Sequence, residues 1–273
     1  AIQKALGMYA FFLDADDLLD PNLFFDLSKE IENDPHDIYL YRYYSMNSDG
    51  SHPKASISYF ESGKIFEGQS KAMIYERVLR GSFHSLCVKA IKLSLMQNDS
   101  TDYAKFSSLF YGEDMVMSLQ PLTQAHSIKY LDVPYYYYRN NPESIIKTFN
   151  KRKFDNLFFA YQVLHSYLEQ WNISEDQKNL FGDSFISAII SLLNGAILAK
   201  VPYSTFKKLI REKLHQEPLF KEYLAVFKEP QGNDKLIKLF PLFGVCLKQG
   251  FLFPYYLFVR TLTFLYSTYT RKR

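Results

Sequence analysis

Four carboxylates follow a run of large apolar residues close to the start of the chain. The stretch reads FFLDADDLLDP over residues 11–21, with aspartates at Asp14, Asp16, Asp17 and Asp20. Negative charge concentrated at the end of a buried strand is costly unless cations or hydrogen-bond donors offset it. Oxygen-rich sites at strand ends suit Mg²⁺ or Mn²⁺, which bridge phosphate oxygens. We therefore expect a divalent cation and a diphosphate to offset the charge of Asp14 and Asp16.

The spacing of this acidic stretch tests two different roles for it. Asp20 precedes Pro21, a pair typical of a helix N-cap followed by proline in the first turn, but a cap does not account for the earlier aspartates. A calcium-binding EF-hand loop starting at Asp14 would need Gly at its sixth position and Glu at its twelfth. Leu19 and Phe25 stand there, so this loop is excluded.

Two further features follow along the chain. Glu113 and Asp114 come directly after Gly112 and open an apolar helix. Carboxylates in a first helical turn interact favourably with the helix dipole, which alone would account for such a pair. The third feature is PYYYYR at 134–139, an aromatic run that ends in Arg139 and that an ordinary edge strand would also contain.

Strands and helices alternate over the first half of the chain. The continuous apolar run at 8–13 predicts a buried, parallel strand before the aspartates. The other predicted elements are helix 22–33, strand 37–46, helix 69–80, a strand from 82, a helix from 114 and a strand with its following loop over 127–145. This alternation predicts an α/β fold with a mainly parallel or mixed sheet.

The second half changes character near residue 150, which predicts two regions, 1–150 and 151–273. Helical patterns occupy 154–171, 181–200 and 203–216. The tail, 236–273, is aromatic and apolar, but Lys248, Pro254 and Arg260 interrupt it, so it is too broken for a membrane span. We expect one or two helices there that lie on a membrane surface, form a homodimer contact or pack on the protein's own core.

Composition narrows the classes of function. Hydrophobic residues make up 47% of the chain and aromatic residues 17%, with 22 Tyr and 24 Phe, which predicts aromatic-lined grooves or an interface. A net charge of +3 is too small to indicate nucleic-acid binding. Cys87 and Cys246 have no metal-like spacing, which fits a reducing compartment and a cytoplasmic protein.

The three features, taken in order, strongly resemble the family 2 glycosyltransferases of the GT-A fold, a Rossmann-like architecture with a mixed sheet. The resemblance covers about residues 1–147, followed here by a helical C-terminal region. The family pattern is met by Ala5, Gly7, Tyr9, Leu13, Asp14, Asp16, Asp17, then Gly112, Glu113, Asp114, then Tyr136, Tyr138, Arg139 and Ser144.

The resemblance implies transfer of one sugar from a nucleotide-diphosphate sugar to an acceptor hydroxyl, with inversion. It implies that Asp16 binds Mg²⁺ or Mn²⁺ and that Asp14 faces the metal or the nucleotide ribose. Asp114 would be the general base, with Glu113 as the fallback. Arg139 would contact phosphate or order a closing loop.

The resemblance also sets expectations for partners. The acceptor would be a saccharide or lipid-linked saccharide of a surface polysaccharide or teichoic-type polymer, with the enzyme peripheral at the inner face of the cell membrane. His84 is a candidate acceptor contact. The family's nucleotide-binding strands precede the Asp-x-Asp strand, so we expect this chain to lack that part and to be inactive alone.

Two alternatives stay open at this point. One is a non-catalytic interaction module derived from a truncated transferase fold. The other is a phosphatase of the haloacid dehalogenase type, which also begins with a strand and Asp-x-Asp. That resemblance implies Thr or Val two residues after the second Asp, where this chain has Leu18.

Overall fold

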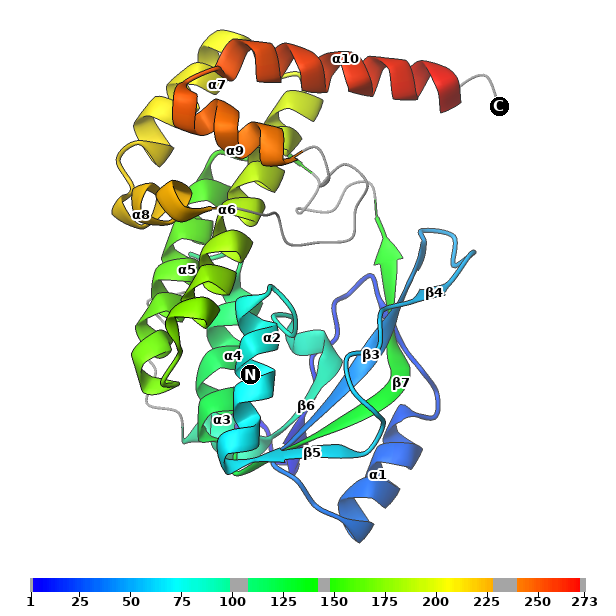
Figure 1. The fold of residues 1–273 in the computed structure, drawn as a ribbon. Helices are drawn as coiled ribbons and strands as arrows, with labels where there is room; N and C mark the ends of the chain where they lie inside the picture. Colours follow the sequence, from blue (N-terminus) through cyan, green and yellow to red (C-terminus); the bar gives the residue numbers. More distant parts are fainter. Residues whose placement is uncertain (1, 99–107, 142–147, 228–239, 271–273) are drawn as a thin grey trace. The chain divides into compact units, whose positions relative to one another are not determined.

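The computed structural model describes residues 2–98, 108–141, 148–227 and 240–270 (Figure 1). Contacts divide the chain into two compact units. Unit 1 comprises Ala1–Val78 and Ser82–Ser144, and unit 2 comprises Leu79–Gly81 and Ile145–Arg273. Whether these units correspond to domains over 1–150 and 151–273 stays a prediction.

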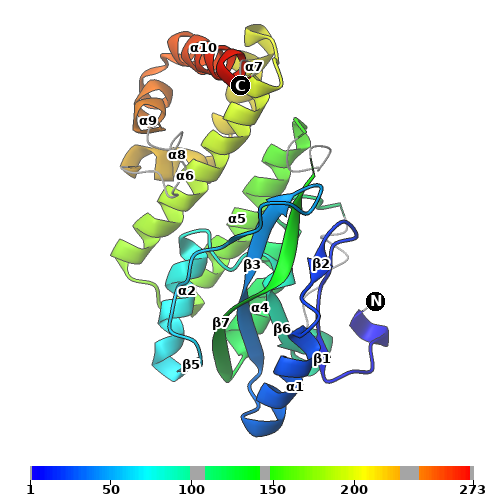
Figure 2. The same cartoon turned by 90° about the vertical axis from the view of Figure 1, so that its right-hand side faces the viewer.

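Unit 1 is built on a mixed sheet, which confirms the predicted α/β class (Figure 2). The strands run in the order β1-β6-β3-β7-β2, with β4 paired to β3 and β5 paired to β7. Among the described pairs, β3 and β7 are parallel and the others antiparallel. Their bounds are β1 (Tyr9–Ala10), β2 (Leu18–Leu19), β3 (Ile38–Asn47), β4 (Lys54–Ala55), β5 (Lys64–Glu67), β6 (Lys89–Lys92) and β7 (Ser127–Asn140).

The long strands β3 and β7 form the centre of the sheet because both are rich in aromatic and β-branched residues, which suit a pleated, buried surface. Ile38 pairs with Ile128 and Leu40 with Tyr130, and all four side chains are 0% exposed. Beyond Leu40 the register shifts at a bulge, and pairing continues to the end of β7. The predicted strands at 37–46 and within 127–145 are confirmed.

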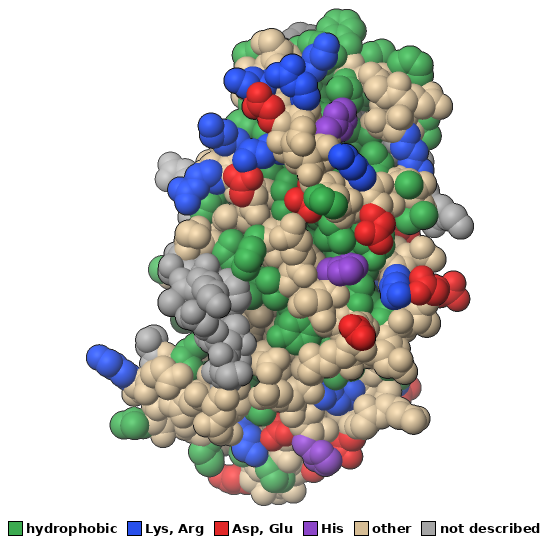
Figure 3. Space-filling view, turned by 90° about the vertical axis from the view of Figure 1, so that its left-hand side faces the viewer, with side chains coloured by type: hydrophobic (Ala, Val, Ile, Leu, Met, Phe, Trp, Pro, Cys, Tyr) green, Lys and Arg blue, Asp and Glu red, His purple; other side chains and the backbone are tan. Residues whose placement is uncertain are grey.

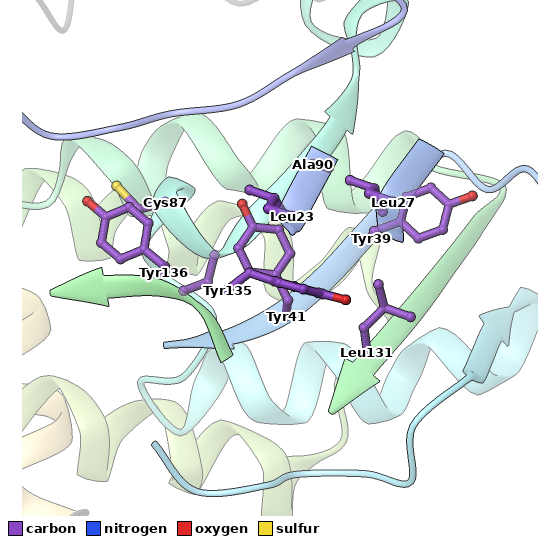
Figure 4. Close-up of a cluster of buried hydrophobic side chains, with 10 residues drawn as sticks. Leu23, Leu27, Tyr39, Tyr41, Cys87, Ala90, Leu131, Tyr135 and Tyr136 are labelled. Atoms are coloured by element: carbon purple, nitrogen blue, oxygen red, sulfur yellow. The ribbon is translucent and has the colours of Figure 1, made fainter. Parts of the chain in front are cut away.

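The helices of unit 1 are α1 (Leu23–Asn33), α2 (Ala72–Leu79), α3 (Leu93–Gln97) and α4 (Glu113–Gln124), with 3₁₀ turns at Ile2–Lys4, Gly68–Lys71 and Leu86–Val88. Helix α1 packs on the sheet through Leu23 and Leu27, which are 0% and 1% exposed. Figure 4 shows these leucines among tyrosines of β3 and β7. The same buried cluster extends to Cys87 and Tyr136, so the core reaches the region of the acidic motifs.

Three boundaries differ from the predictions. The predicted strand 8–13 is reduced to β1, which pairs antiparallel with β6 instead of parallel. The strand is short because β1 lies at the sheet edge with one described neighbour, and beyond it Leu13 is 51% exposed. The strand predicted from residue 82 begins only at Lys89, because a 3₁₀ turn over Leu86–Val88 precedes it. Helix 69–80 begins as a 3₁₀ turn and continues as α2.

The predicted N-cap at Asp20 is also wrong in detail. Helix α1 begins at Leu23, and no side-chain hydrogen bond caps it. Asp20 Oδ1 instead accepts from the backbone N–H of Asn22 at 2.9 Å. The carboxylate therefore stabilises the turn before the helix, and Pro21 lies in that turn instead of at the first helical position.

Unit 2 is helical, as predicted. Its described helices are α5 (Arg152–Gln170), α6 (Glu175–Leu198), α7 (Tyr203–Leu209) with a π turn at Ile210–Leu214, α8 (Pro218–Val226), α9 (Phe240–Gln249) and α10 (Leu252–Thr270). A capping box formed by Ser174 and Gln177 starts α6. A Cβ on Gly182 would lie 2.3 Å from the ring of Tyr223, so glycine at this position permits the close approach of α8 to α6.

By length and composition, α6 is the one helix in the described part of the chain that could cross a membrane. Its most apolar window is, however, 56% buried inside the structure. Phe181, Phe185 and Ile189 are 0% exposed. Such burial is typical of a core helix.

The tail forms two helices, α9 and α10, where one or two were predicted; residues 236–239 and 271–273 lie outside the described residues. Two tyrosines hold α10 in unit 2. Tyr255 donates to Asn194 Oδ1, and Tyr256 donates to the carbonyl of Val201 at 2.6 Å. The opposite side of α10 leaves large apolar residues exposed at Phe253, Leu257 and Phe258.

Candidate active site

Asp17 anchors the acidic loop between β1 and β2. Its side chain is 5% exposed and accepts two hydrogen bonds from β7. The hydroxyl of Tyr136 donates to Oδ2 at 2.6 Å, and the backbone N–H of Arg139 donates to Oδ1 at 2.7 Å. Burial and the bond to Asp17 raise the pKa of Tyr136, which therefore stays a donor. Two hydrogen-bond donors of β7 therefore help to offset the charge of this aspartate.

The neighbouring tyrosines of β7 bind other carboxylates in the same way. Tyr135 donates to Asp26 Oδ2 at 3.1 Å, and Tyr137 donates to Asp20 Oδ2 at 3.2 Å. Burial and these acceptors raise the pKa values of both hydroxyls. The antiparallel register of β2 with β7, in which Leu18 pairs with Tyr137, brings the acidic loop to these tyrosines. Three consecutive tyrosines thus organise the acidic loop and the helix that follows it.

Arg139 and Asn141 hold Asp16. The guanidinium Nε of Arg139 donates to the backbone carbonyl of Asp16, and Asn141 Nδ2 donates to Asp16 Oδ2 at 3.1 Å. The Asp16 side chain is exposed to solvent. Arg139 therefore orders the acidic loop itself; a contact with phosphate stays a prediction.

Asp14 is in a different environment from its neighbours. Its backbone N–H donates to the Tyr136 hydroxyl at 3.3 Å. Asp14 is exposed to solvent as a residue, but partial burial of its carboxyl raises the pKa, and the charges of Asp114, Asp17 and Asp16 raise it further. The negative charge on Asp14 is therefore not fully offset by the protein around it.

The negative charges of Glu113 and Asp114, at the start of α4, interact with that of Asp14. Burial raises the pKa of Glu113, and the charges of Asp114 and Asp14 add to this rise. Glu113 Oε2 is buried without a hydrogen-bond partner among the described residues. Carboxylates that are a hundred residues apart in sequence thus share one electrostatic environment.

The geometry of α4 determines how Asp114 is presented. Gly112 precedes the helix with φ of 86°, a left-handed conformation that favours glycine. The backbone N–H of Leu86 donates to Asp114 Oδ2 at 3.2 Å. The hydroxyl of Ser118 donates to the Asp114 carbonyl at 2.7 Å. One carboxylate oxygen of Asp114 is therefore fixed by an amide from a separate loop.

A divalent cation fits the donor chemistry of this site. Within the described ranges, no three His, Cys, Asp or Glu side chains are grouped so as to hold a metal ion. The carboxylates of Asp14 and Asp16 are nevertheless hard oxygen ligands on one loop. The raised pKa of Asp14 and the buried, unpartnered oxygen of Glu113 both indicate negative charge that a cation would relieve.

Residues 1–101 match the family model described as glycosyl transferase family 2. Over these residues the chain is similar to that family. EpsH of Bacillus subtilis (strain 168), a protein named as a glycosyltransferase, is 24% identical over 233 residues. The match covers 82% of this chain and 64% of EpsH, so the chain spans less than two thirds of that relative.

Solved structures share the fold of this chain. The crystal structure of S. aureus TarS 1–349 in complex with UDP has a TM-score of 0.57 and 14% identity, covering 100% of this chain and 70% of that one. The complex of the same fragment with UDP-GlcNAc has a TM-score of 0.58 and 14% identity, covering 95% and 68%. These likenesses confirm the predicted GT-A type of α/β fold.

His84 lies among backbone groups that it helps to hold in place. Its ring Nε2 donates to the carbonyl of Val78 at 2.8 Å. Burial lowers its pKa to about 4, so the ring is neutral near pH 7 although part of it is accessible. Its predicted contact with an acceptor stays untested.

Sequence reasoning missed the partners of the acidic residues. It did not predict the bond from Tyr136 to Asp17 or the amide of Leu86 at Asp114. The available signal was a run of four tyrosines at 135–138 in a chain with a run of aspartates at 14–20. What the sequence lacked was the register of β2 with β7, which sets these runs against each other.

Unit 2 contains a pocket of about 780 Å³. It is lined by the end of α5, the start of α6 and α8, with polar residues such as Asn172 and Glu222 around Leu168 and Tyr223. None of the predicted site residues lines it. The candidate active site therefore rests on the acidic motifs of unit 1 and not on this pocket.

Proposed function

We propose that the chain transfers a sugar from a nucleotide-diphosphate sugar to an acceptor hydroxyl, with inversion at the anomeric carbon. The observation that carries this proposal is the shared electrostatic environment of Asp14, Glu113 and Asp114. An inverting transfer needs a place for the diphosphate and a base on the acceptor side. In this proposal the acidic loop provides the place for the diphosphate, and the start of α4 provides the base.

We assign the base to Asp114. Its Oδ2 is held by the Leu86 amide, and we assign Oδ1 to the proton of the acceptor hydroxyl. Glu113 is the fallback, because its buried carboxyl has a raised pKa and is a weaker candidate for an ionised base at neutral pH.

On the donor side, Asp14 and Asp16 would hold Mg²⁺ or Mn²⁺. A bound divalent cation would neutralise the charge of the leaving diphosphate. Arg139 binds the backbone of Asp16, which supports our proposal that its guanidinium contacts the diphosphate. We assign Asp17 no part in metal or donor binding, because both of its carboxylate oxygens accept hydrogen bonds from β7.

The comparisons suggest the type of donor and product. TarS was crystallised with UDP and with UDP-GlcNAc. We therefore propose a UDP-sugar donor, and an acceptor in a surface polysaccharide or teichoic-type polymer, saccharide or lipid-linked.

The experiment is an assay of the purified chain, and of the natural gene product that carries it, against a panel of UDP-sugars with Mg²⁺ or Mn²⁺. We expect UDP release that depends on the cation, and a product whose anomeric configuration is inverted by NMR. Release of sugar phosphate without UDP would indicate phosphatase chemistry. Failure of both proteins to bind or cleave any sugar nucleotide would contradict the proposal.

We also propose that unit 2 contacts the cytoplasmic face of a membrane. Exposed apolar residues of α10 lie near α7, since the rings of Phe253 and Tyr203 are 5.0 Å apart. Exposed Lys207, Lys208 and Arg211 lie on α7 and the π turn, and Figure 3 shows Lys and Arg gathered at one end of the face drawn. Apolar burial with cations near anionic lipid supports surface binding, each cation adding about 1 kcal/mol.

Liposome co-sedimentation tests this contact. We expect the chain to bind anionic vesicles at low salt, to lose binding as salt rises, and to bind less without residues 251–273. Equal binding by both forms, or no binding at low salt, would favour a packing helix. Concentration-dependent dimers lost with the same truncation would favour a dimer contact instead.

A further inference from the structure

Lys89 of β6 is a lysine whose side chain is 0% exposed. Its ammonium donates to two backbone carbonyls, that of Phe83 at 2.6 Å and that of Ser85. Burial lowers its pKa to about 7, while the negative charge of Asp114 acts in the opposite direction. A buried cation is costly, and an apolar residue of similar size would fill the same volume without that cost. Filling the core therefore does not account for a lysine at this position.

The two carbonyls belong to the loop 82–86, which carries the amide bound to Asp114. Phe83 in this loop has φ of 55°, an unusual conformation for a non-glycine residue. A left-handed residue persists where surrounding contacts hold it. The further contacts are His84 Nε2 to the Val78 carbonyl at 2.8 Å, Ser118 Oγ to the His84 carbonyl at 3.2 Å, and Cys87 N–H to Ser85 Oγ at 3.1 Å.

We propose that Lys89 is a positioning residue for the acceptor-side base. By binding the carbonyls of Phe83 and Ser85 it fixes the loop that presents the Leu86 amide to Asp114. The side-chain nitrogen of Lys89 thus acts on Asp114 through one backbone segment. This inference rests on the proposed function, because it takes Asp114 as the group that receives the acceptor proton.

The chain contains a matched control for Lys89. Lys71 is also buried, at 7% exposed, and its ammonium also binds two carbonyls, those of Thr123 and Ala125, each at 2.7 Å. These carbonyls lie at the end of α4, whereas Asp114 lies at its start. Loss of Lys71 therefore removes the same type of interaction from unit 1 without touching the loop 82–86.

The experiment compares Lys89→Met with Lys71→Met. Both should lower the melting temperature. We expect Lys89→Met to lower kcat by about 10- to 100-fold, since a small misplacement of a reacting group is costly, with donor Kd changed by less than about twofold. Lys71→Met should not change kcat appreciably.

A second pair of variants tests the amide directly. Leu86 begins a 3₁₀ turn, and Ser85 before it has φ −66° and ψ 136°, a conformation compatible with a following proline. Leu86→Pro removes the N–H that binds Asp114, and Leu86→Ala keeps it while removing the side chain. We expect Leu86→Pro to lower kcat at least about 10-fold more than Leu86→Ala.

Equal losses of kcat in Lys89→Met and Lys71→Met would overturn the positioning role. A measurement that needs no donor separates this failure from that of the proposed function. Hydrogen exchange of the Leu86 amide, followed by NMR, should be faster in Lys89→Met than in the wild-type chain and unchanged in Lys71→Met. A wild-type chain without transferase activity whose variants still showed this difference would contradict the proposed function alone.

Discussion

Asp17 and Asp14 lie on the same loop, but their carboxylates have different surroundings. Asp17 accepts from a tyrosine hydroxyl and a backbone amide, and its charge is fully offset within the protein. Asp14 lies among like charges, which together with burial raise the pKa of its carboxyl. The comparison separates a carboxylate that holds the loop from one that remains available to a ligand. A run of aspartates is therefore not one site with equal members.

The largest effect should come from Asp16, on the ligand side of this comparison. We expect Asp16→Asn to abolish metal-dependent transfer, because removal of one charged ligand weakens a hard cation strongly. The activity should be measured across Mn²⁺ concentrations, with donor binding followed separately. The matched control is Asp176→Asn, an exposed aspartate of α6, which should keep full activity. Full activity of Asp16→Asn at low Mn²⁺ would remove Asp16 from the metal site.

A smaller loss of activity is expected at Asp114. Asp114→Asn keeps the shape of the side chain but cannot accept the acceptor proton. Turnover should fall by a factor on the order of 10² to 10⁴, the usual contribution of a general base, while donor Kd changes little. Calorimetry of donor binding and single-turnover kinetics separate the two quantities. A variant that mainly weakened donor binding would show that the base is another residue, with Glu113 tested next.

On the structural side, Asp17→Ala should lower the free energy of unfolding by about 3 kcal/mol. The substitution leaves the Tyr136 hydroxyl and the Arg139 amide without their buried acceptor. Urea denaturation measures the change. Tyr137→Phe removes only the more exposed hydroxyl bond to Asp20 and should cost about 1 kcal/mol. Equal costs for both variants would contradict the distinction between the buried anchor and its neighbours.

The smallest expected effect is a gain in stability instead of a loss of activity or stability. The pKa of Asp14 in the folded chain is raised above its ordinary value of 3.8. The folded state therefore loses stability as pH rises through that raised pKa and the carboxyl ionises. Asp14→Asn should remove this loss and raise the melting temperature at pH 7, but not at pH 3. Millimolar Mn²⁺ should stabilise the wild-type chain and not the variant, and destabilisation by Asp14→Asn at pH 7 would contradict this account.

The order of motifs was sufficient to predict the glycosyltransferase resemblance and the mixed sheet, whereas the roles of the site residues stay predictions. The type and order of Asp14, Glu113 and Asp114 limit the chemistry that these side chains can perform at the end of a strand and the start of a helix. The short β1 was not predictable, because an apolar run does not reveal how many neighbours a strand has. Lys89 lies in a short alternating stretch, VKAIK, where a surface lysine would look the same. Its burial depends on a loop conformation that no local pattern encodes.

The bond from Tyr136 to Asp17 joins residues 119 positions apart, and this separation has a consequence for folding. During synthesis at about 5 to 20 residues per second, the aspartates leave the ribosome roughly 6 to 24 seconds before their tyrosine partners. Such distant contacts slow folding, because the intervening chain must be ordered first. The nascent acidic loop therefore stays hydrated and charged until β7 is made. The strand that completes the centre of the sheet is the same strand that assembles the site, so a nascent chain ending before β7 would have neither.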